Sequence, residues 1–132
     1  MSHSNNSFNS HSTLDVNGKE YCYYAINGGE LSAYPNINRL PVSAKILLEN
    51  LLRHEDGLVC SREDIKVLAA SAGQTSTQEI AFHPARVLMQ DFTGVPAIVD
   101  LAAMRHALVK QGLDPQKINP LSRVDLVIDH SV

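Results

Sequence analysis

Leucines at helical spacing form the clearest pattern in the first half of the chain. Residues 43–53 read SAKILLENLLR, in which apolar residues recur every three or four positions and charged residues occupy the other side. This periodicity predicts an amphipathic helix with Ser43 as its N-cap. A second helix is predicted to begin at residues 61–64, SRED, which resemble a capping box, and to end at Gly73.

Short β-prone segments on either side of Asn17-Gly18 predict a β-hairpin, because both central residues of a type I′ turn need positive φ. Its second strand carries Tyr21, Tyr23 and Tyr24, whose rings could stack on RNA bases. Without interleaved Lys or Arg, a strand packed on the domain surface is the favoured interpretation. Residues 79–82 are interpreted as another short strand.

The first thirteen residues, MSHSNNSFNSHST, contain no Asp, Glu, Lys or Arg and are dominated by Ser and Asn. Such a segment buries too little apolar surface to offset its ordering entropy. We therefore expect residues 1–13 to be a disordered leader and residues 14–132 to form the ordered domain. No secretory signal is expected, since the N-terminus has no basic region followed by an apolar one.

A strand–helix–strand pattern occupies the last third of the chain. Residues 86–90 and 124–128 are predicted to be buried strands, separated by a turn at Thr93-Gly94 and a helix from Pro96 to Gly112. A connection of this length and type makes the two strands parallel. The sequence therefore predicts an α/β fold.

Both predicted strands become polar where they end, one at Gln90 and the other at Asp129-His130. The carboxyl ends of parallel strands meet at one edge of a sheet, where ligands bind in open α/β folds. An aspartate beside a histidine can fix the imidazole tautomer and raise its pKa, which prepares it to donate a proton. The alternatives are structural. In these, Asp129 and His130 are neighbours in the sequence by chance, and Gln90 stabilises a turn.

The composition narrows the class of protein. The 132 residues are 44% hydrophobic with a formal net charge of −3, which excludes wholesale disorder and disfavours binding to nucleic-acid phosphates. Runs of consecutive apolar residues are short, so no membrane-spanning segment is expected. Cys22 and Cys60 are far apart and form no metal-ligand motif. The expected location is the cytoplasm, with its reducing conditions.

Three long strings then point to a family: LPVSAKILLENLLRHEDG (40–57), PARVLMQDFTGVPAIVDLAAMR (84–105) and NPLSRVDLVIDHSV (119–132). Together they resemble the N-terminal region of the aconitases, in the branch of the bacterial aconitase A and iron regulatory proteins. The resemblance runs from about Tyr21 to Val132. One departure is Arg123, where proline is expected.

The resemblance implies a truncated three-layer α/β/α domain with a mostly parallel sheet. It implies a lyase that interconverts citrate and isocitrate through cis-aconitate on a [4Fe–4S] cluster. Gln90 matches the glutamine that hydrogen-bonds the substrate, and Asp129 and His130 match the pair that manages the proton of the departing hydroxyl. No metal ligand is assigned in this chain, since Cys22 and Cys60 match none of the three cluster cysteines.

Members of this family are several times longer, so we expect the chain to be inactive without the rest of its polypeptide. A 2-methylisocitrate dehydratase or a related hydro-lyase is the alternative within the class. Binding of mRNA by a cluster-free form, as in the iron regulatory proteins, is an alternative of another class, although the net charge of −3 disfavours it. A stand-alone interaction domain is the third alternative.

Overall fold

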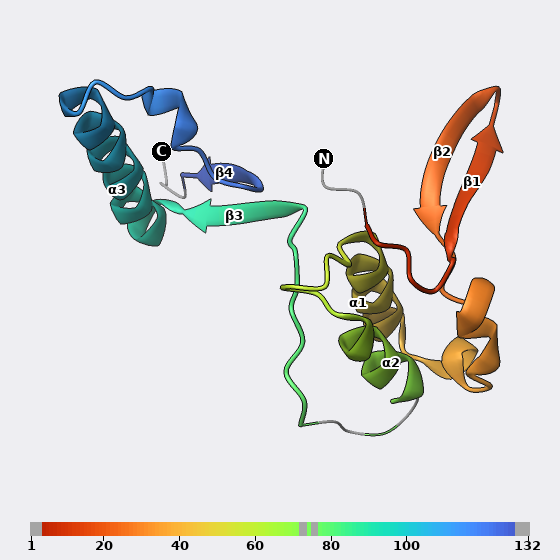
Figure 1. Ribbon diagram of the computed structural model, residues 1–132. Helices are drawn as coiled ribbons and strands as arrows, with labels where there is room; N and C mark the ends of the chain where they lie inside the picture. Colours follow the sequence, from red (N-terminus) through yellow and green to blue (C-terminus); the bar gives the residue numbers. More distant parts are fainter. Residues whose placement is uncertain (1–3, 72–73, 75–76, 129–132) are drawn as a thin grey trace. The chain divides into compact units, whose positions relative to one another are not determined.

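The computed structural model describes residues 4–71, 74 and 77–128. The chain divides into two compact units, Met1–His83 and Pro84–Val132, and each is considered by itself. The first unit contains the strands β1 (His11–Val16) and β2 (Lys19–Tyr24), two short 3-10 helices (Gly29–Ala33 and Ile37–Arg39), and the helices α1 (Val42–Arg53) and α2 (Arg62–Ala70). The second contains β3 (Arg86–Gln90), α3 (Asp91–Lys110), a 3-10 turn (Pro115–Lys117) and β4 (Arg123–Val127) (Figure 1).

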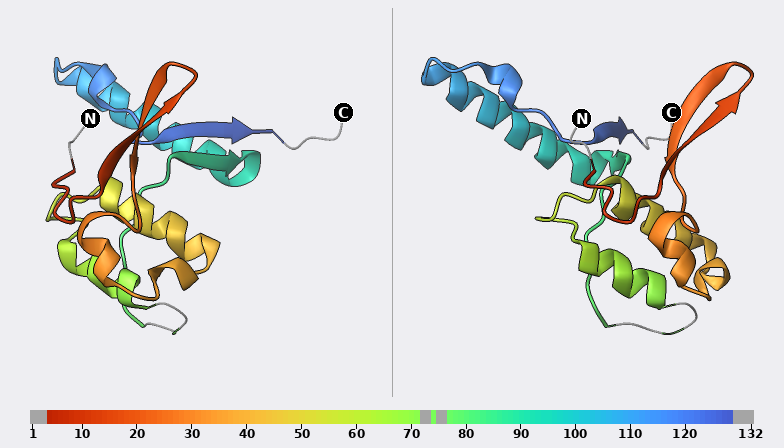
Figure 2. Two further views of the ribbon diagram at one scale, coloured as in Figure 1. Left: turned by 90° about the vertical axis from the view of Figure 1, so that its right-hand side faces the viewer. Right: turned by 45° about the vertical axis from the view of Figure 1, so that its right-hand side comes forward.

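The core of the first unit forms where α1 packs against α2, and the two helices lie side by side in both views of Figure 2. The buried leucines of the predicted stripe are Leu48, Leu51 and Leu52, which confirms the amphipathic helix. The N-cap is Pro41 rather than Ser43, because the backbone becomes helical at Val42. The capping box is confirmed, since Ser61 Oγ accepts from Asp64 N while Asp64 Oδ2 accepts from Ser61 N.

Residues 4–10 belong to this core, so the prediction of a disordered leader is wrong for the described part of 1–13. The ring of Phe8 is 1% exposed, and the Arg62 guanidinium lies 4.3 Å from its centroid. Ser7 N donates to Glu55 Oε2 at 2.9 Å, and Ser4 Oγ donates to the carbonyl of Leu52 at 2.7 Å. One aromatic ring and a few specific hydrogen bonds outweigh a composition that is otherwise typical of disorder.

The hairpin is confirmed, with Asn17 at φ 55° and Gly18 at φ 79°, as a type I′ turn requires. Its first strand begins at His11, inside the predicted leader. Tyr21 and Tyr23 remain exposed on this two-stranded sheet, whereas Tyr24 packs against the core. Residues 79–82 pair with no strand and instead run as an extended segment, so that strand prediction is wrong.

The second unit is a parallel strand pair with α3 packed against one face of it. Pairing of Arg86 with Arg123 through Gln90 with Val127 confirms the predicted parallel arrangement. Helix α3 begins at Asp91, five residues before the predicted start, and Pro96 lies inside it. Gly94 is buried in the helix rather than forming a turn with Thr93. The α/β class is therefore correct for the described residues.

Close contact between helix and sheet explains Gly94. A Cβ atom added there would lie 2.9 Å from Met89 Cβ and 2.5 Å from Leu126 Cδ1, so a side chain would push the helix off the strands. The helix ends as predicted near Gly112, which has φ 70° and follows the last helical residue by two positions.

By length and composition alone, α3 could cross a membrane, with a mean hydropathy of 1.3. The expectation that no segment spans a membrane was based on runs of consecutive apolar residues, and it stays a prediction, since length and composition alone do not show that a helix crosses a membrane. Core helices of soluble proteins have the same composition. Apolar residues lie on all sides of α3, which is typical of a helix that is covered on more than one side.

Candidate active site

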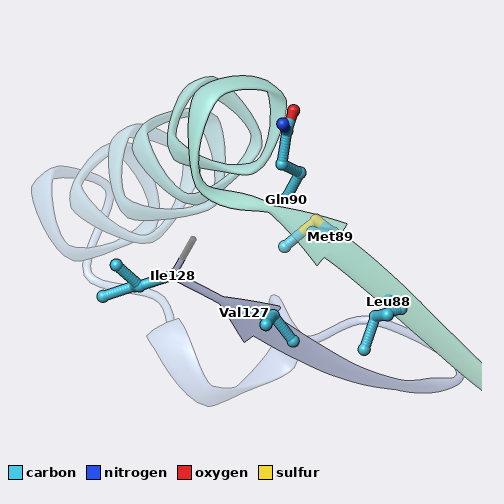
Figure 3. Close-up of a pocket in the computed structure, with 5 residues that line it drawn as sticks. All are labelled: Leu88, Met89, Gln90, Val127 and Ile128. Atoms are coloured by element: carbon cyan, nitrogen blue, oxygen red, sulfur yellow. The ribbon is translucent and has the colours of Figure 1, made fainter. Parts of the chain in front are cut away.

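Gln90 is the last residue of β3 and the N-cap of α3, so a strand end and a helix start fix its backbone. Its φ of −75° and ψ of 154° are extended, and its side chain makes no capping hydrogen bond to the helix. Figure 3 shows the side-chain amide extending past the strand end beside the first turn of α3. The amide is exposed, so it is available to bind a ligand.

A hollow of about 350 Å³ lies at this end of the strand pair. Its lining consists of residues from the two strand ends: Leu88, Met89, Gln90, Val127 and Ile128 (Figure 3). Gln90 is the one polar residue among them. An apolar surface with a single amide can orient a ligand but supplies no acid, base or charge of its own.

The register brings the two strand ends level. Gln90 pairs with Val127, and Ile128 follows directly on β4 and lines the hollow. Asp129 and His130, the other predicted site residues, follow Ile128 in the sequence and lie outside the described residues. Val127 and Ile128 were not predicted as site residues. The available signal was their position as the last apolar residues of the strand, directly before Asp129.

Asp91, next to Gln90, is 8% exposed despite its charge. Its Oδ1 accepts a hydrogen bond from Phe92 N at 2.8 Å in the first turn of α3, where a carboxylate interacts favourably with the helix dipole. Asp91 therefore has a structural role here. It helps to start the helix immediately after Gln90.

Charged residues occupy the sheet face opposite α3, toward the other end of the strands. Asp125 Oδ2 is 2.5 Å from Arg86 Nε and 3.2 Å from Arg123 Nε. The hydrogen bonds from Arg86 and Arg123 lower the pKa of the Asp125 carboxyl from its ordinary value. Exposed pairs of this kind contribute little to stability, but they favour the register that aligns Gln90 with Val127.

The two cysteines do not fit the ligand set of an iron–sulfur cluster. Cys22 is exposed on β2, whereas Cys60 is buried and its Sγ donates to the carbonyl of Leu51 at 3.2 Å. Burial raises the pKa of the Cys60 thiol to about 11, which disfavours the thiolate that binds iron. Within the described residues, no three His, Cys, Asp or Glu side chains gather as a metal site.

Comparison with known proteins identifies the family. The model of the aconitase family (aconitate hydratase) matches residues 63–132, more than half of the chain. The chain belongs to the aconitase family. The matched region contains both strands that line the hollow and all of the predicted site residues.

Several bacterial proteins named aconitate hydratase A are similar to this aconitase chain. That of Legionella pneumophila is 59% identical over 96% of the chain, and that of Pseudomonas aeruginosa is 58% identical over 91%. The Escherichia coli protein is 56% identical over 91%. The chain spans only 13–14% of the length of these relatives.

Proposed function

We propose that this chain forms the first part of an aconitate hydratase, a lyase that interconverts citrate and isocitrate through cis-aconitate. Membership of the aconitase family supports the proposal, as do three relatives named aconitate hydratase A at 56–59% identity. Those names favour aconitate over 2-methylisocitrate as the substrate class. No observation on the described residues favours mRNA binding or a stand-alone interaction domain.

Gln90 is proposed to hydrogen-bond the tricarboxylate substrate. The observation that carries this role is the position of an exposed, uncapped amide at the carboxyl end of a parallel strand, beside a hollow of about 350 Å³. In open α/β sheets ligands bind beyond this edge. A neutral amide donates to a carboxylate or accepts from a hydroxyl without titrating, so Gln90 would orient the substrate and move no proton.

Asp129 and His130 are proposed to manage the proton on the departing hydroxyl. The support is their sequence position directly after Ile128, at the end of the strand whose residue Val127 pairs with Gln90. A carboxylate beside an imidazole stabilises the imidazolium, which then donates its proton as the C–O bond breaks and water leaves. Gln90 would therefore affect mainly substrate binding, and His130 mainly the rate of dehydration.

A [4Fe–4S] cluster is typical of this family and, when bound, acts as a Lewis acid on a leaving hydroxyl. The described part of this chain offers no ligand set for it, because Cys22 and Cys60 differ in exposure and Cys60 is held as a buried thiol. We propose that the cluster ligands lie in the rest of the polypeptide.

We further propose that β3 and β4 belong to the mostly parallel sheet of a three-layer α/β/α domain. Helix α3 supplies one layer against Met89 and Leu126. The other face exposes Leu88 and Val127, as expected of a sheet that a second layer covers. The exposed free thiol of Cys22 is compatible with a reducing cytoplasm, which we propose as the location.

Steady-state kinetics of the full-length protein test this function. Full-length protein should hydrate cis-aconitate and interconvert citrate and isocitrate. Gln90→Ala should raise KM and lower kcat/KM. The decrease in kcat/KM should correspond to a loss of roughly 1–3 kcal/mol of transition-state stabilisation. Gln116→Ala, an exposed glutamine after α3, is the matched control and should leave both constants unchanged. Unchanged kinetics in Gln90→Ala would contradict the assigned role, and absence of both activities would contradict the function.

A further inference from the structure

Two histidines outside the candidate active site are stacked face to face in the first unit. The ring centroids of His54 and His83 are 4.5 Å apart, with an angle of 16° between the ring planes. His54 is the C-cap of α1, and His83 ends the extended segment 77–83. The contact therefore joins a helix end to a segment that has no strand partner.

Asn50 holds the same segment through two hydrogen bonds. Its Oδ1 accepts from His83 N at 3.0 Å, and its Nδ2 donates to the His83 carbonyl at 2.8 Å. Ile80 packs against the core three residues earlier. The Asn50 amide, the Ile80 side chain and the ring stack therefore all contribute to holding the segment against the rest of the unit.

This arrangement suits neutral imidazoles and disfavours charged ones. His83 Nδ1 is buried and has no hydrogen-bond partner among the described residues. Protonating His54 would place a positive charge against the stacked ring of His83.

The neighbouring charges do not remove this penalty. Burial lowers the pKa of His54 from its ordinary value of 6.5, His83 and Arg53 lower it further, and Glu49 opposes them. Glu49 is itself ion-paired with Arg53, whose guanidinium also lies 5.5 Å from the ring centroid of Tyr24 on β2. The carboxylate is therefore shared with a cation and compensates an imidazolium only in part.

We propose that the stacked pair His54–His83 is a pH-sensitive latch, which holds segment 77–83 against α1 when the His54 ring is neutral and releases it when His54 is protonated. The linkage has a definite sign. Because the pKa of His54 is lowered in the latched state, neutral His54 stabilises that state at pH values above 6.5, the ordinary histidine pKa. This stabilisation is lost as the pH falls below 6.5. The latch should therefore be closed at neutral pH and open in mild acid.

The position of the latch gives it a consequence for the following strand. Pro84 and Ala85 alone separate His83 from β3, the strand that ends at Gln90. Release at low pH would free the backbone that leads into this strand. The inference concerns regulation and does not depend on which reaction the protein catalyses.

Amide hydrogen exchange of the full-length protein, read by mass spectrometry and corrected for the intrinsic rate, tests the latch. Between about pH 8 and about pH 5.5, the protection of segment 77–83, whose His83 amide donates to Asn50 Oδ1, should fall as His54 becomes protonated. Protection of α2, in the same unit, should change much less. Equal protection of 77–83 at both pH values would overturn the proposal.

Ring substitutions separate titration from packing. His54→Phe keeps an aromatic ring but removes the titrating group, so it should abolish the pH-dependent loss. His106→Phe, on the exposed surface of α3, is the matched control and should retain the full loss. A full pH-dependent loss in His54→Phe would overturn the latch.

A measurement on the unsubstituted protein covers the case in which a variant does not fold. NMR titration of the His54 ring protons should give an apparent pKa below 6.5. It should also show protonation coupled to chemical-shift changes of the Asn50 side-chain amide. A His54 titration at or above 6.5, with the Asn50 amide unaffected, would overturn the proposal.

Discussion

Gln90 and Val127 are direct partners across the parallel strands β3 and β4, so the two strands end at the same level. This pairing is the structural basis of the candidate active site. It places an exposed amide at the edge of a hollow whose other wall is formed by Val127 and Ile128. Asp129 and His130 follow Ile128 directly in the sequence, and this position motivates the first prediction.

In full-length protein, His130→Ala should lower kcat by about 10²–10⁴-fold with a smaller change in KM, because general acid catalysis acts in the transition state. Asp129→Asn should also lower kcat and shift the alkaline limb of its pH profile to lower pH, since the charge that favours imidazolium is removed. Initial rates across a pH series provide the measurement.

His106→Ala is the matched control for these variants, because His106 lies exposed on α3. Its kcat should equal that of the parent. If His130→Ala stays within a few-fold of the parent while remaining folded, the proton-transfer role is wrong.

Gly94→Ala should destabilise the second unit by about 1–3 kcal/mol, although alanine is the better helix former. The added Cβ would lie 2.9 Å from Met89 Cβ and 2.5 Å from Leu126 Cδ1. Urea denaturation gives the free energy of unfolding. In a Leu126→Ala background the same substitution should be less harmful, because one of the two contacts is gone, and simple additivity would argue against the steric explanation.

Phe8→Ala should lower the free energy of unfolding by about 3–5 kcal/mol, because it empties a fully enclosed site in the core. Phe82→Ala is the matched control, since that ring is 54% exposed, and it should have a much smaller effect. Thermal unfolding of both variants is the comparison to make. Equal effects would mean that residues 4–10 are not part of the cooperative core, as the sequence composition suggested.

The two cysteines should be dispensable for an iron–sulfur cluster. In full-length protein, Cys22→Ser should leave iron content, visible absorbance and activity unchanged, because Cys22 is an exposed residue of the hairpin. The 132 residues alone, treated anaerobically with iron and sulfide, should form no stoichiometric cluster, since they contain two cysteines and a conventional site needs three or four ligands. Loss of absorbance in Cys22→Ser would show that it is a ligand.

Local sequence signals were sufficient where a short-range physical rule decides the structure. Asn17-Gly18 specified the hairpin turn because both residues adopt positive φ. Ser61 and Asp64 specified the start of α2, since the capping box is complete within four residues. The strand–helix–strand pattern implied parallel strands, because a crossover helix leaves no other direction for the second strand.

Long-range packing decided what the sequence could not. Phe8 orders a polar segment because its ring enters a core built from residues between Leu31 and Ala69, at least 23 positions away, and composition carries no record of that contact. Gly94 looked like a turn residue, but it belongs to a helix that must approach Met89 and Leu126 closely. The pairing of Gln90 with Val127 and the stacking of His54 on His83 are likewise tertiary, because each joins residues about thirty or more positions apart whose register only the folded chain determines.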